Sequence, residues 1–312
     1  MYVYTAYNLC IHSEIPLPEL VVSQGSPDII VRLEKLDSIP QETIDQGDRF
    51  GGKFEEIGTL LVQYGQQILV DPVPGLDESI LRTYILGSLM AVLLRQRGLL
   101  VLHASSVAIN NGSVGFLGGS GWGKSTLAQA FHAQGYDILT DDVMGIDMET
   151  AHPLVLPGFP QLKLWSEAAT AIGYVPESFP ILHPGIEKRS HYLTGGFCQT
   201  ALPLQRIYVL AVGTEHAIAK LEPQTALIEL VRHSRGVISL TAPKYVSSHL
   251  RQCANLVNQV PICRFQRKPS LEALSELVRL VEEDLAQAVC HEADSTCSKR
   301  QRAEGRGQKV YY

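Results

Sequence analysis

A lysine and two hydroxyl residues close a short glycine-rich stretch, "GGSGWGKST", at residues 118–126. Gly118, Gly123, Lys124 and Ser125 match the pattern G-x-x-x-x-G-K-[ST] at every fixed position. Glycine costs roughly 0.5–1 kcal/mol in ordered structure relative to alanine, so such a concentration indicates a backbone path that a Cβ would block. A chain that turns its N–H groups inward around phosphate oxygens follows such a path. The stretch therefore predicts a phosphate-binding loop.

The residue types in this loop suit a nucleoside triphosphate. Lys124 is expected to reach the β- and γ-phosphates, and the Ser125 hydroxyl to bind Mg²⁺. The N-terminus of a following helix would add free N–H donors and a favourable dipole. The alternative is a plain glycine-rich turn between a strand and a helix. The residues expected to bind ATP here are Gly118, Gly119, Ser120, Gly121, Trp122, Gly123, Lys124, Ser125 and Thr126.

Two adjacent aspartates, Asp141 and Asp142, follow the apolar run "YDILT". The carboxyl ends of strands present ligand groups in α/β sheets. One carboxylate could hold Mg²⁺, with Asp142 as the metal candidate beside Ser125, and the other could accept a proton from an incoming hydroxyl. The sequence does not assign the two roles, and the pair could instead solvate a strand end. His103, which ends "LLVLH", is either a core residue or part of the same site.

Further cations follow the aspartates. Lys163 comes after a Pro-Gly turn, and Lys188 and Arg189 lie in a proline-bounded stretch that is expected to form a closing loop. Cations beyond the loop lysine commonly offset the charge of a transferred phosphoryl group. Lys188 and Arg189 are therefore candidate nucleotide-binding residues, although all three side chains could also be solvated surface charges.

The elements that must position these residues begin with a β-rich region. Residues 1–75 contain short β-branched and aromatic runs separated by Pro and Gly, which are typical of a small sheet with turns. A helix is expected from a cap at Asp77 to about Arg97. Two strands around an Asn-Gly turn, within residues 99–117, then lead into the glycine loop, and a helix follows that ends near Gly135.

The chain beyond Asp147 is rich in proline and is expected to be mostly loop, before strands and helices return near residue 206. A helix is expected from Ser270 to about Val289, and the polar stretch after it predicts disorder. These elements indicate a mixed α/β fold. The expected parts are a β-rich lobe with a connecting helix at 1–97, a nucleotide-binding domain at 98–289 and a disordered tail at 290–312.

Composition narrows the class of protein. The chain has 312 residues, of which 45% are hydrophobic and 19% charged, and its net charge is −6. No charge of either sign dominates, so neither a nucleic acid nor a membrane is expected as a partner. The apolar stretch 84–94 is too short to cross a bilayer and is expected to be a buried helix. The N-terminus lacks signal-peptide features, and the six scattered cysteines form no C-x-x-C pair, so a cytoplasmic protein is expected.

The combination "LHASS…GGSGWGKST…ILTDD" resembles the HPr kinase/phosphorylase family, whose catalytic domain shares its phosphate loop with phosphoenolpyruvate carboxykinases. His103-Ala104, the loop 118–125 and Asp141-Asp142 carry this resemblance. It implies a P-loop core of that type, transfer of a phosphoryl group from ATP with Mg²⁺ to a serine hydroxyl, and an Asp of the pair as base with His103 nearby. By analogy with the family, it also implies a homo-oligomer.

The family's Arg-Gly-rich segment after the aspartates is replaced here by "LPGFPQLKLW", so the resemblance does not extend to HPr as substrate or to phosphorolysis. With "PLPEL" and "EKR", the chain looks more like the HPr-kinase-like proteins of peptide-tailoring gene clusters, including those of lasso peptides. Those proteins phosphorylate a serine of a precursor peptide.

The expected function is therefore an ATP- and Mg²⁺-dependent serine kinase of a small peptide or protein. Its catalytic residues would be Asp141, Asp142, His103 and Lys124. One alternative is a nucleotide-gated peptide-binding protein that transfers nothing, and another is a kinase of a small alcohol such as free serine. A carboxykinase-type decarboxylase would need a longer chain and a second metal site. The acceptor, the base preference and the oligomeric state are not readable from the residues.

Overall fold

The computed structural model describes residues 1–37, 39, 44–171, 175, 181–183, 186–237 and 239–287. They belong to two compact units, Met1–Pro269 and Ser270–Tyr312. In the second unit residues 274–287 are helical, so the helix expected from Ser270 begins later than predicted. The tail expected to be disordered, 290–312, lies outside the described residues. The predicted boundary at residues 97 and 98 falls within the first unit and stays a prediction.

The first sheet is built from the β-branched runs of the N-terminal region. It has eight strands in the order β3-β1-β2-β4-β8-β7-β6-β5. The β2–β4 and β4–β8 pairs are parallel, and the remaining pairs are antiparallel. Its strands are β1 (Tyr2–Ala6), β2 (Leu9–Ser13), β3 (Val21–Val22), β4 (Ile29–Leu33), β5 (Ile44–Gln46), β6 (Arg49–Phe54), β7 (Gly58–Gln63) and β8 (Gln67–Pro72).

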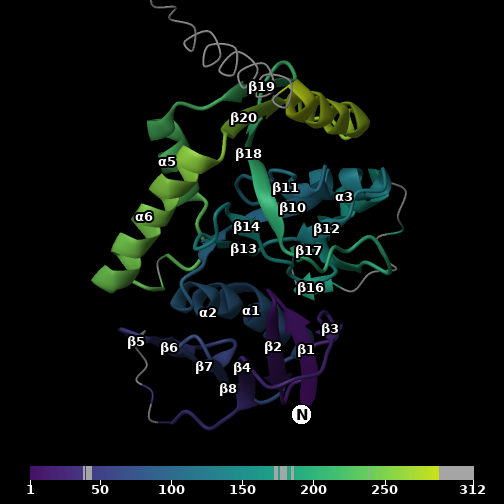
Figure 1. Cartoon of the computed structure of the whole chain (residues 1–312). Coiled ribbons are helices and arrows are strands. Elements are labelled where there is room, and N and C mark those ends of the chain that lie inside the picture. Colours follow the sequence, from purple (N-terminus) through teal and green to yellow (C-terminus); the bar gives the residue numbers. More distant parts are fainter. Residues whose placement is uncertain are drawn as a thin grey trace, which may run out of the picture. The chain divides into compact units, whose positions relative to one another are not determined.

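A continuous helical stretch follows, as expected from the cap at Asp77. The Asp77 carboxylate accepts a hydrogen bond from the Ser79 backbone N–H at 2.7 Å. The stretch consists of α1 (Glu78–Tyr84), the π-helical segment η1 (Ile85–Leu89) and α2 (Met90–Gln96). It packs between the two larger sheets, with α2 contacting both β7 and β9 (Figure 1). The apolar run that could not cross a membrane is thus a buried helix, as predicted.

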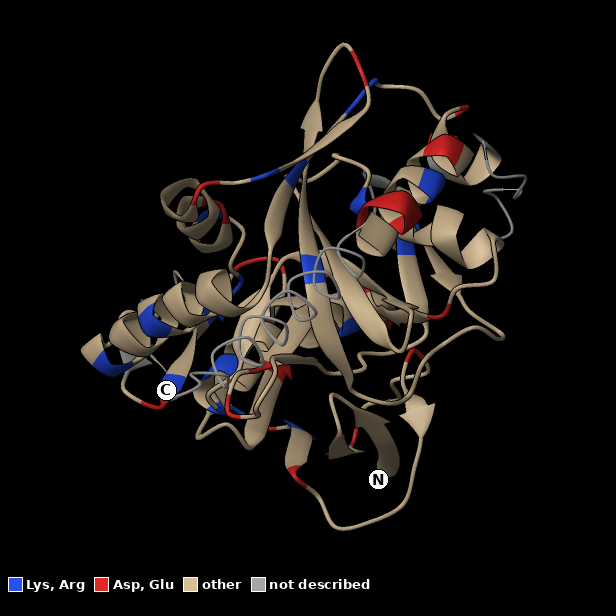
Figure 2. Ribbon diagram, turned by 45° about the horizontal axis from the view of Figure 1, so that its top comes forward, with Lys and Arg blue, Asp and Glu red and all other residues tan. Residues whose placement is uncertain are grey.

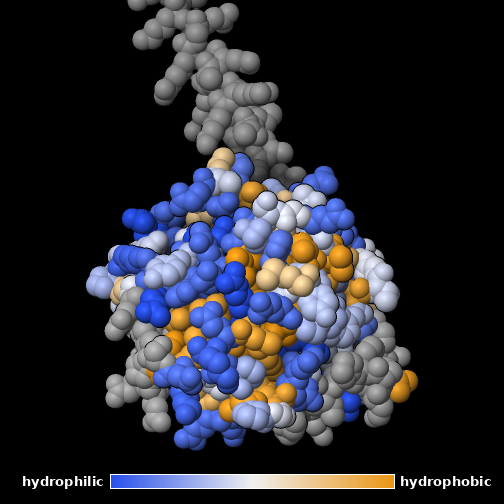
Figure 3. All heavy atoms as spheres, turned by 90° about the horizontal axis from the view of Figure 1, so that it is seen from below, coloured by the Kyte–Doolittle hydropathy of each residue, from blue (hydrophilic) through white to orange (hydrophobic). Residues whose placement is uncertain are grey.

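Alternation along the strands divides the apolar residues of the first sheet between its two faces. Leu60, Val62, Ile68 and Val70 belong to the large core that includes the helix. On the other face, Leu61 and Leu69 form a small separate cluster with Leu36. Figure 3 shows apolar side chains gathered on this side of the molecule.

The second sheet positions the candidate site. It contains β12-β10-β11-β18-β14-β13-β9 in that order, with β20 beside β18 and β19 beside β20. The β11–β18 and β18–β20 pairs are parallel. Its strands are β9 (Leu100–Leu102), β10 (Ala104–Ile109), β11 (Gly112–Leu117), β12 (Ile138–Thr140), β13 (Met144–Asp147), β14 (Leu154–Val155), β18 (Leu202–Val212), β19 (Ala217–Lys220) and β20 (Ile262–Arg267).

The hairpin before the glycine loop is confirmed with two corrections. Its two turn residues are Asn110 and Asn111, both left-handed with φ of 50° and 60°, and Gly112 already pairs with Ile109. The single strand expected before the turn is interrupted at His103. The part before His103, β9, pairs with β13, whereas β10 pairs with β11 and β12. A change of pairing partner leaves no mark on a continuous apolar run, so the sequence did not predict the break.

Helices cover the second sheet. Helix α3 (Lys124–Ala133) contacts β10 and β11, and α5 (Pro223–Arg232) packs against α6 (Pro243–Gln259) (Figure 1). The apolar residues of α5, α6 and the sheet form a second buried core that includes Leu230, Leu256 and Ile207. The structure departs most from the prediction in the proline-rich region that follows Asp147.

That region was expected to be mostly loop, and the expectation is wrong for its described part. Strands β15 (Gln161–Trp165), β17 (Ile186–Tyr192) and β16 (Ile181–His183) form a third sheet, and α4 (Ser166–Ala171) follows β15. Lys188 and Arg189 therefore lie on a strand and not on a closing loop. The prolines around these short strands mark the ends of segments. Because they are numerous, they favoured the prediction of a loop over the weak strand pattern.

Charge is distributed as the composition predicted. The ribbon in Figure 2 shows basic and acidic positions interspersed over the helices and strands. Among the described residues, the helices are all too short or too polar to traverse a lipid bilayer. Most of the residues predicted to form the functional site lie at one edge of the second sheet, after β11 and β12.

Candidate functional site

The glycine loop runs from the end of β11 to the start of α3, the strand and helix that the sequence predicted. Gly121 and Gly123 have φ of 78° and 77°, in the left-handed region that disfavours a Cβ. At Gly119, a Cβ would lie 3.0 Å from the Trp122 indole nitrogen. Glycine is thus required both by the backbone conformation and by the close packing of the loop on its own tryptophan.

Lys124 is the first residue of α3, and its side chain folds back over the loop. The ammonium donates to the carbonyl oxygens of Gly118 and Gly119, at 3.0 and 3.1 Å. It also lies 3.1 Å from Nε2 of His103. Only 6% of Lys124 is exposed. The cation is therefore held at the centre of the loop with little access to bulk water.

Burial is the largest influence on this ammonium and lowers the pKa of Lys124 to about 8. The charges of Asp141 and Asp142 oppose the decrease, while those of Lys188 and Arg235 add to it. Near neutral pH the side chain is still protonated, but it loses its proton far more readily than an exposed lysine.

Asp141 connects the loop to its neighbouring strands. It follows β12 and is 4% exposed. Its Oδ1 accepts hydrogen bonds from the hydroxyls of Ser105, at 2.6 Å, and Ser125, at 2.8 Å. Its Oδ2 accepts from the backbone N–H of Lys163, at 2.8 Å. These three hydrogen bonds fix the carboxylate beside the Ser125 hydroxyl.

Asp142 has different partners, although it is the adjacent residue. Its carboxylate is held by the Lys163 ammonium at 2.8 Å, by the Arg235 guanidinium, and by Nδ1 of His103 at 3.0 Å. Burial alone would raise the pKa of Asp142, but Lys163, His103 and Arg235 together hold it well below its usual range. The backbone of Asp142 is left-handed, with φ of 74°, which turns its side chain away from that of Asp141.

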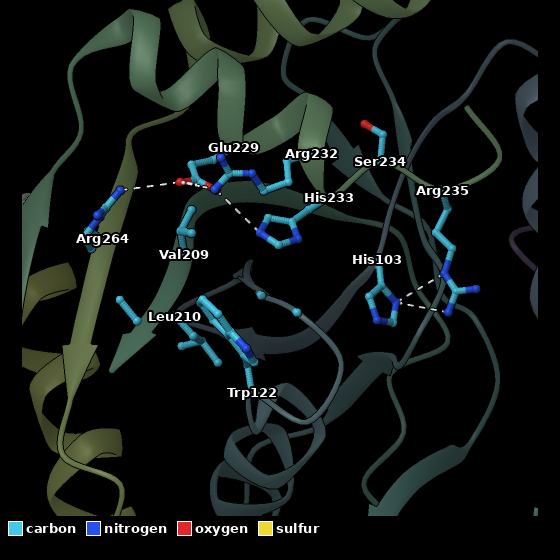
Figure 4. A pocket seen from close by; sticks show the side chains of 13 residues that line it. His103, Trp122, Val209, Leu210, Glu229, Arg232, His233, Ser234, Arg235 and Arg264 are labelled. Carbon is cyan, nitrogen blue, oxygen red and sulfur yellow. Dashed lines mark hydrogen bonds and ion pairs between the residues drawn. The ribbon is translucent and has the colours of Figure 1, made fainter. Parts of the chain in front are cut away.

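Arg235 is the site residue that sequence reasoning missed. It follows α5, and the backbone of this segment pairs with β9: His103 N–H donates to the His233 carbonyl at 2.7 Å, and Arg235 N–H donates to the Val101 carbonyl at 2.9 Å. The Arg235 side chain then lies against His103 (Figure 4), and its guanidinium donates to the Asp142 carboxylate. No local pattern marks this arginine, because a tertiary contact brings it to the site.

The remaining predicted residues divide into those near the loop and those on β17. The Trp122 ring is 45% exposed, the Thr126 side chain is buried at the start of α3, and Ser120 is exposed. The ammonium of Lys188 stacks on the Trp165 ring, 5.5 Å from its centroid. It is thus held by the third sheet, and its charge still lowers the pKa of Lys124 after the larger effect of burial.

A cavity of about 590 Å³ opens beside the loop (Figure 4). Ligand sites commonly have volumes of roughly 300–1,000 Å³, so its size suits a small organic ligand. Val209, Leu210 and Ala211 form an apolar wall, and Glu229, Arg232 and Arg264 form a charged end. The cavity is lined by His103, Gly118, Gly119, Trp122, Val209, Leu210, Ala211, Glu229, Arg232, His233, Ser234, Arg235 and Arg264.

The charged end is organised around Glu229 of α5, which is 7% exposed. Its carboxylate pairs with Arg232 at 3.2 Å, Arg264 at 3.4 Å and His233 at 3.6 Å. Figure 4 shows this cluster across the cavity from the Trp122 ring. The cavity therefore offers a flat aromatic surface at one end and hydrogen-bonding groups at the other.

The described residues contain no cluster of three or more His, Cys, Asp or Glu side chains that could hold a metal by themselves. An ion at this site would therefore need oxygen donors from the protein and from a ligand together. Ser125 and Asp141 offer two such oxygens 2.8 Å apart. All-oxygen sites with few protein ligands, completed by phosphates and water, suit Mg²⁺.

These features define the protein as a mixed α/β protein with a glycine loop between a strand and a helix, and with two differently partnered aspartates beside it. No family model matches the chain, and no curated protein matches its sequence. Among solved structures, the chain is similar to the HPr(Ser) kinase/phosphatase from Coxiella burnetii. The identity is 12% and the TM-score 0.32, over 64% of this chain and 96% of that one. A likeness of this size leaves the function to be argued from the site.

Proposed function

We propose that the protein is an ATP- and Mg²⁺-dependent kinase that transfers the γ-phosphoryl group to a hydroxyl, most simply a serine of a small peptide or protein. The observation that carries the proposal is that Asp141 and Asp142 have different partners. Asp141 bonds the Ser125 hydroxyl of the glycine loop, whereas Asp142 faces Lys163, Arg235 and His103. A protein that only binds a nucleotide needs the first arrangement and not the second.

The nucleotide's phosphates would lie in the glycine loop. The Lys124 ammonium already bonds two loop carbonyls and can exchange them for phosphate oxygens. The N–H groups at the start of α3 and the left-handed positions Gly121 and Gly123 favour the same anion. The cavity beside the loop is large enough for the nucleoside, with the Trp122 ring as a stacking surface.

The metal would be held by Ser125 and Asp141. When bound, Mg²⁺ would offset the negative charge of the phosphate oxygens. The contact between the Ser125 hydroxyl and Asp141 Oδ1 supports Asp141 for this role, in place of Asp142, which the sequence had favoured. Asp142 already pairs with two cations, Lys163 and Arg235, so a metal there would meet strong repulsion from them.

Asp142 and His103 would receive the acceptor. The acceptor oxygen forms a bond to the γ-phosphorus as the bond from that phosphorus to the β–γ bridging oxygen breaks, and ADP leaves with the electron pair. The hydroxyl proton passes to the Asp142 carboxylate, with His103 in contact with it. Lys163 and Arg235 offset the charge that spreads over the equatorial oxygens. Because the transition state is loose, orientation of the hydroxyl matters more than the basicity of Asp142.

The proposal is tested by incubating the purified chain with ATP, Mg²⁺ and a panel of serine-containing peptides and free alcohols, and measuring phosphorylated products by mass. We expect transfer that Lys124→Ala and Asp142→Asn each reduce by about 100-fold or more, the scale on which charged groups act in phosphoryl-transfer sites. Lys220→Ala, on exposed β19, is the matched control. Equal yields from Lys124→Ala and wild type would refute the mechanism.

The alternatives give different results in the same assay. Product only with free serine or another small alcohol would make the protein a small-molecule kinase with the same residues. ATP binding that requires Lys124, without any phosphorylated product or ADP from any acceptor, would support a nucleotide-gated peptide-binding protein. The serine peptide is favoured by the resemblance of the loop and aspartates to HPr-kinase-like proteins, and a precursor peptide is the first acceptor to test.

A further inference from the structure

A second cavity, of about 250 Å³, lies between the first sheet, the end of α2 and the first half of α6. It shares no lining residue with the cavity beside the glycine loop. Its size is that of a small metabolite and not of a nucleotide. Its lining is mostly polar, unlike the apolar core around it, and includes Asp48, Arg95, Gln96, Lys244, Ser248, His249 and Gln252.

Arg95 is the unusual member of this lining. It is only 5% exposed, and burial lowers its pKa. Its guanidinium has five N–H donors, of which one nitrogen donates to the Gly236 carbonyl at 2.7 Å. Among the described residues, no carboxylate forms an ion pair with Arg95. A buried cation normally requires an anionic partner, because leaving it unpaired in a low dielectric is costly. The cavity that Arg95 lines is where such a partner fits.

The other charges at the cavity leave an excess of positive charge. Lys244 lies at the rim, with its side chain 56% exposed. Asp48 is the single acid in the lining, and it is already engaged by the Lys244 ammonium at 2.5 Å and by the Tyr245 hydroxyl. His249 carries no charge near neutral pH, because burial and then the Arg95 charge lower its pKa to about 4.

The cavity is joined to the candidate active site by one short segment. Gly236 accepts from Arg95, and the Ser234 hydroxyl lies 2.7 Å from Nε2 of His249. Between these two residues stands Arg235, whose side chain holds Asp142 on the other side. Residues 234–236 therefore contact Arg95 and His249 of the second cavity and Asp142 of the candidate active site.

We propose that the second cavity binds a small anionic metabolite through Arg95. Occupancy of the cavity shifts the position of Arg235 and thereby changes ATP binding and phosphoryl transfer at the candidate active site. The ligand chemistry is an oxyanion, a phosphate ester or a carboxylate. Its binding is independent of the proposed kinase function, whereas its effect on phosphoryl transfer rests on that function. By linkage, any effect of the anion on ATP affinity must equal the effect of ATP on the anion.

The test uses the full chain carrying Lys124→Ala, so that phosphate does not bind in the glycine loop. Binding of inorganic phosphate and of citrate is measured by calorimetry and by the shift in Tm, at constant ionic strength set with chloride. We expect saturable binding, and the stronger of the two probes identifies the source as phosphate or carboxylate. Heats no different from those of chloride would overturn the proposal.

Three further variants locate the site. Ser248 has exposure to the cavity and no hydrogen bond among those described, so Ser248→Glu places a negative charge in the cavity and Ser248→Gln is a neutral control of the same size. We expect Ser248→Glu and Arg95→Gln to weaken anion binding by about tenfold or more, the scale of a lost charge-assisted hydrogen bond, while Ser248→Gln keeps it. Equal binding by Ser248→Glu and Ser248→Gln would overturn the assignment, even if Arg95→Gln proves unstable.

The coupling has its own measurement. With Lys124 restored, the affinity for ATP is measured with and without the stronger anion, in Ser248→Gln and Ser248→Glu. We expect a change of about threefold or more in Ser248→Gln that is lost in Ser248→Glu. Anion binding without this change would overturn the coupling to Arg235. Loss of ATP binding in every variant, with anion binding intact, would instead refute the proposed kinase.

Discussion

The Ser125 hydroxyl donates a hydrogen bond to Oδ1 of Asp141 at 2.8 Å, across a separation of 16 residues in the chain. Ser125 belongs to the first turn of α3, and Asp141 follows the strand to which that helix returns. Strand β12 runs parallel to β11, since both pair antiparallel with β10, so their carboxyl ends lie at the same edge. The contact therefore follows from the topology and not from the loop alone.

The first prediction concerns the metal. Ser125→Ala and Asp141→Asn each remove one of the two oxygens, so we expect the Mg²⁺ concentration for half-maximal transfer to rise by about tenfold or more. Nucleotide binding measured in EDTA should change little in Ser125→Ala, because Lys124 and the loop amides remain. The measurement is phosphoryl transfer as a function of Mg²⁺ concentration.

Ser26→Ala, at an exposed serine outside the glycine loop, is the control. Its Mg²⁺ dependence should match that of wild type. If Asp142→Asn, and not Asp141→Asn, raised the Mg²⁺ requirement, the metal would lie on the other aspartate.

The second prediction concerns pH. Burial lowers the pKa of Lys124 to about 8, so the ammonium is present below that pH and lost above it. ATP binds best to the ammonium form, so affinity should be constant below about pH 7 and fall by up to about tenfold per unit above the pKa of the free protein, which is about 8. Bound phosphates raise the pKa of Lys124 in the complex, so the fall ends once the pH reaches that higher pKa. The Kd of an unreactive ATP analogue from pH 6 to 10 measures this.

Lys124→Arg separates this effect from other titrations, because a guanidinium keeps its charge across the range. Its affinity at pH 7 should be lower than that of wild type, since its fork does not fit the two loop carbonyls. Its pH profile should nevertheless be flat between pH 7 and 9. A profile of Lys124→Arg that falls as steeply as wild type would assign the titration to another group.

Local patterns predicted the parts of the site that are local. The glycine loop, its flanking strand and helix, and the cap at Asp77 were predicted because their residues are adjacent and the backbone demands specific types there. The two aspartates were predicted as a pair, but their partners were not. The side chains of Asp141 and Asp142 point in different directions because the backbone at Asp142 is left-handed. That conformation is unusual for a residue other than glycine.

Tertiary contacts decided the rest. Arg235 reaches the site because its segment pairs with β9, and nothing in "RHSRG" indicates that. Lys188 was expected on a loop, yet it lies on β17 opposite Trp165, because prolines at segment ends outweighed a short strand pattern. The break of the expected strand at His103 likewise depends on which strands β9 and β10 pair with.

The third prediction concerns Arg235. Burial raises the pKa of Asp142, whereas the nearby cations lower it. Arg235→Ala removes one of these cations. That pKa should therefore rise, and the acid limb of the transfer rate should move to higher pH. Transfer should fall by about 100-fold, much more than the affinity for ATP falls, because in the proposed mechanism Arg235 faces the transferred group. The pH–rate profile and the KM for ATP measure both effects.

Arg251→Ala, on the exposed side of α6, is the control and should behave like wild type. Arg235→Lys should recover part of the rate and most of the normal acid limb, because it restores charge without the guanidinium fork. An acid limb that does not move in Arg235→Ala would show that Asp142 is not the group that must be ionised.

The last prediction uses the two tryptophans of the chain, Trp122 and Trp165. Trp122 lines the cavity beside the loop and is 45% exposed, whereas Trp165 packs against Lys188 on the third sheet. If the nucleobase stacks on Trp122, ATP should quench its fluorescence, and Trp165→Phe should retain the quench while Trp122→Phe loses it. Trp122→Ala should also weaken ATP by about 1–3 kcal/mol, the value of a base–aromatic stack, and should weaken inorganic triphosphate much less. Equal losses for ATP and triphosphate would show that Trp122 supports the loop and does not contact the base.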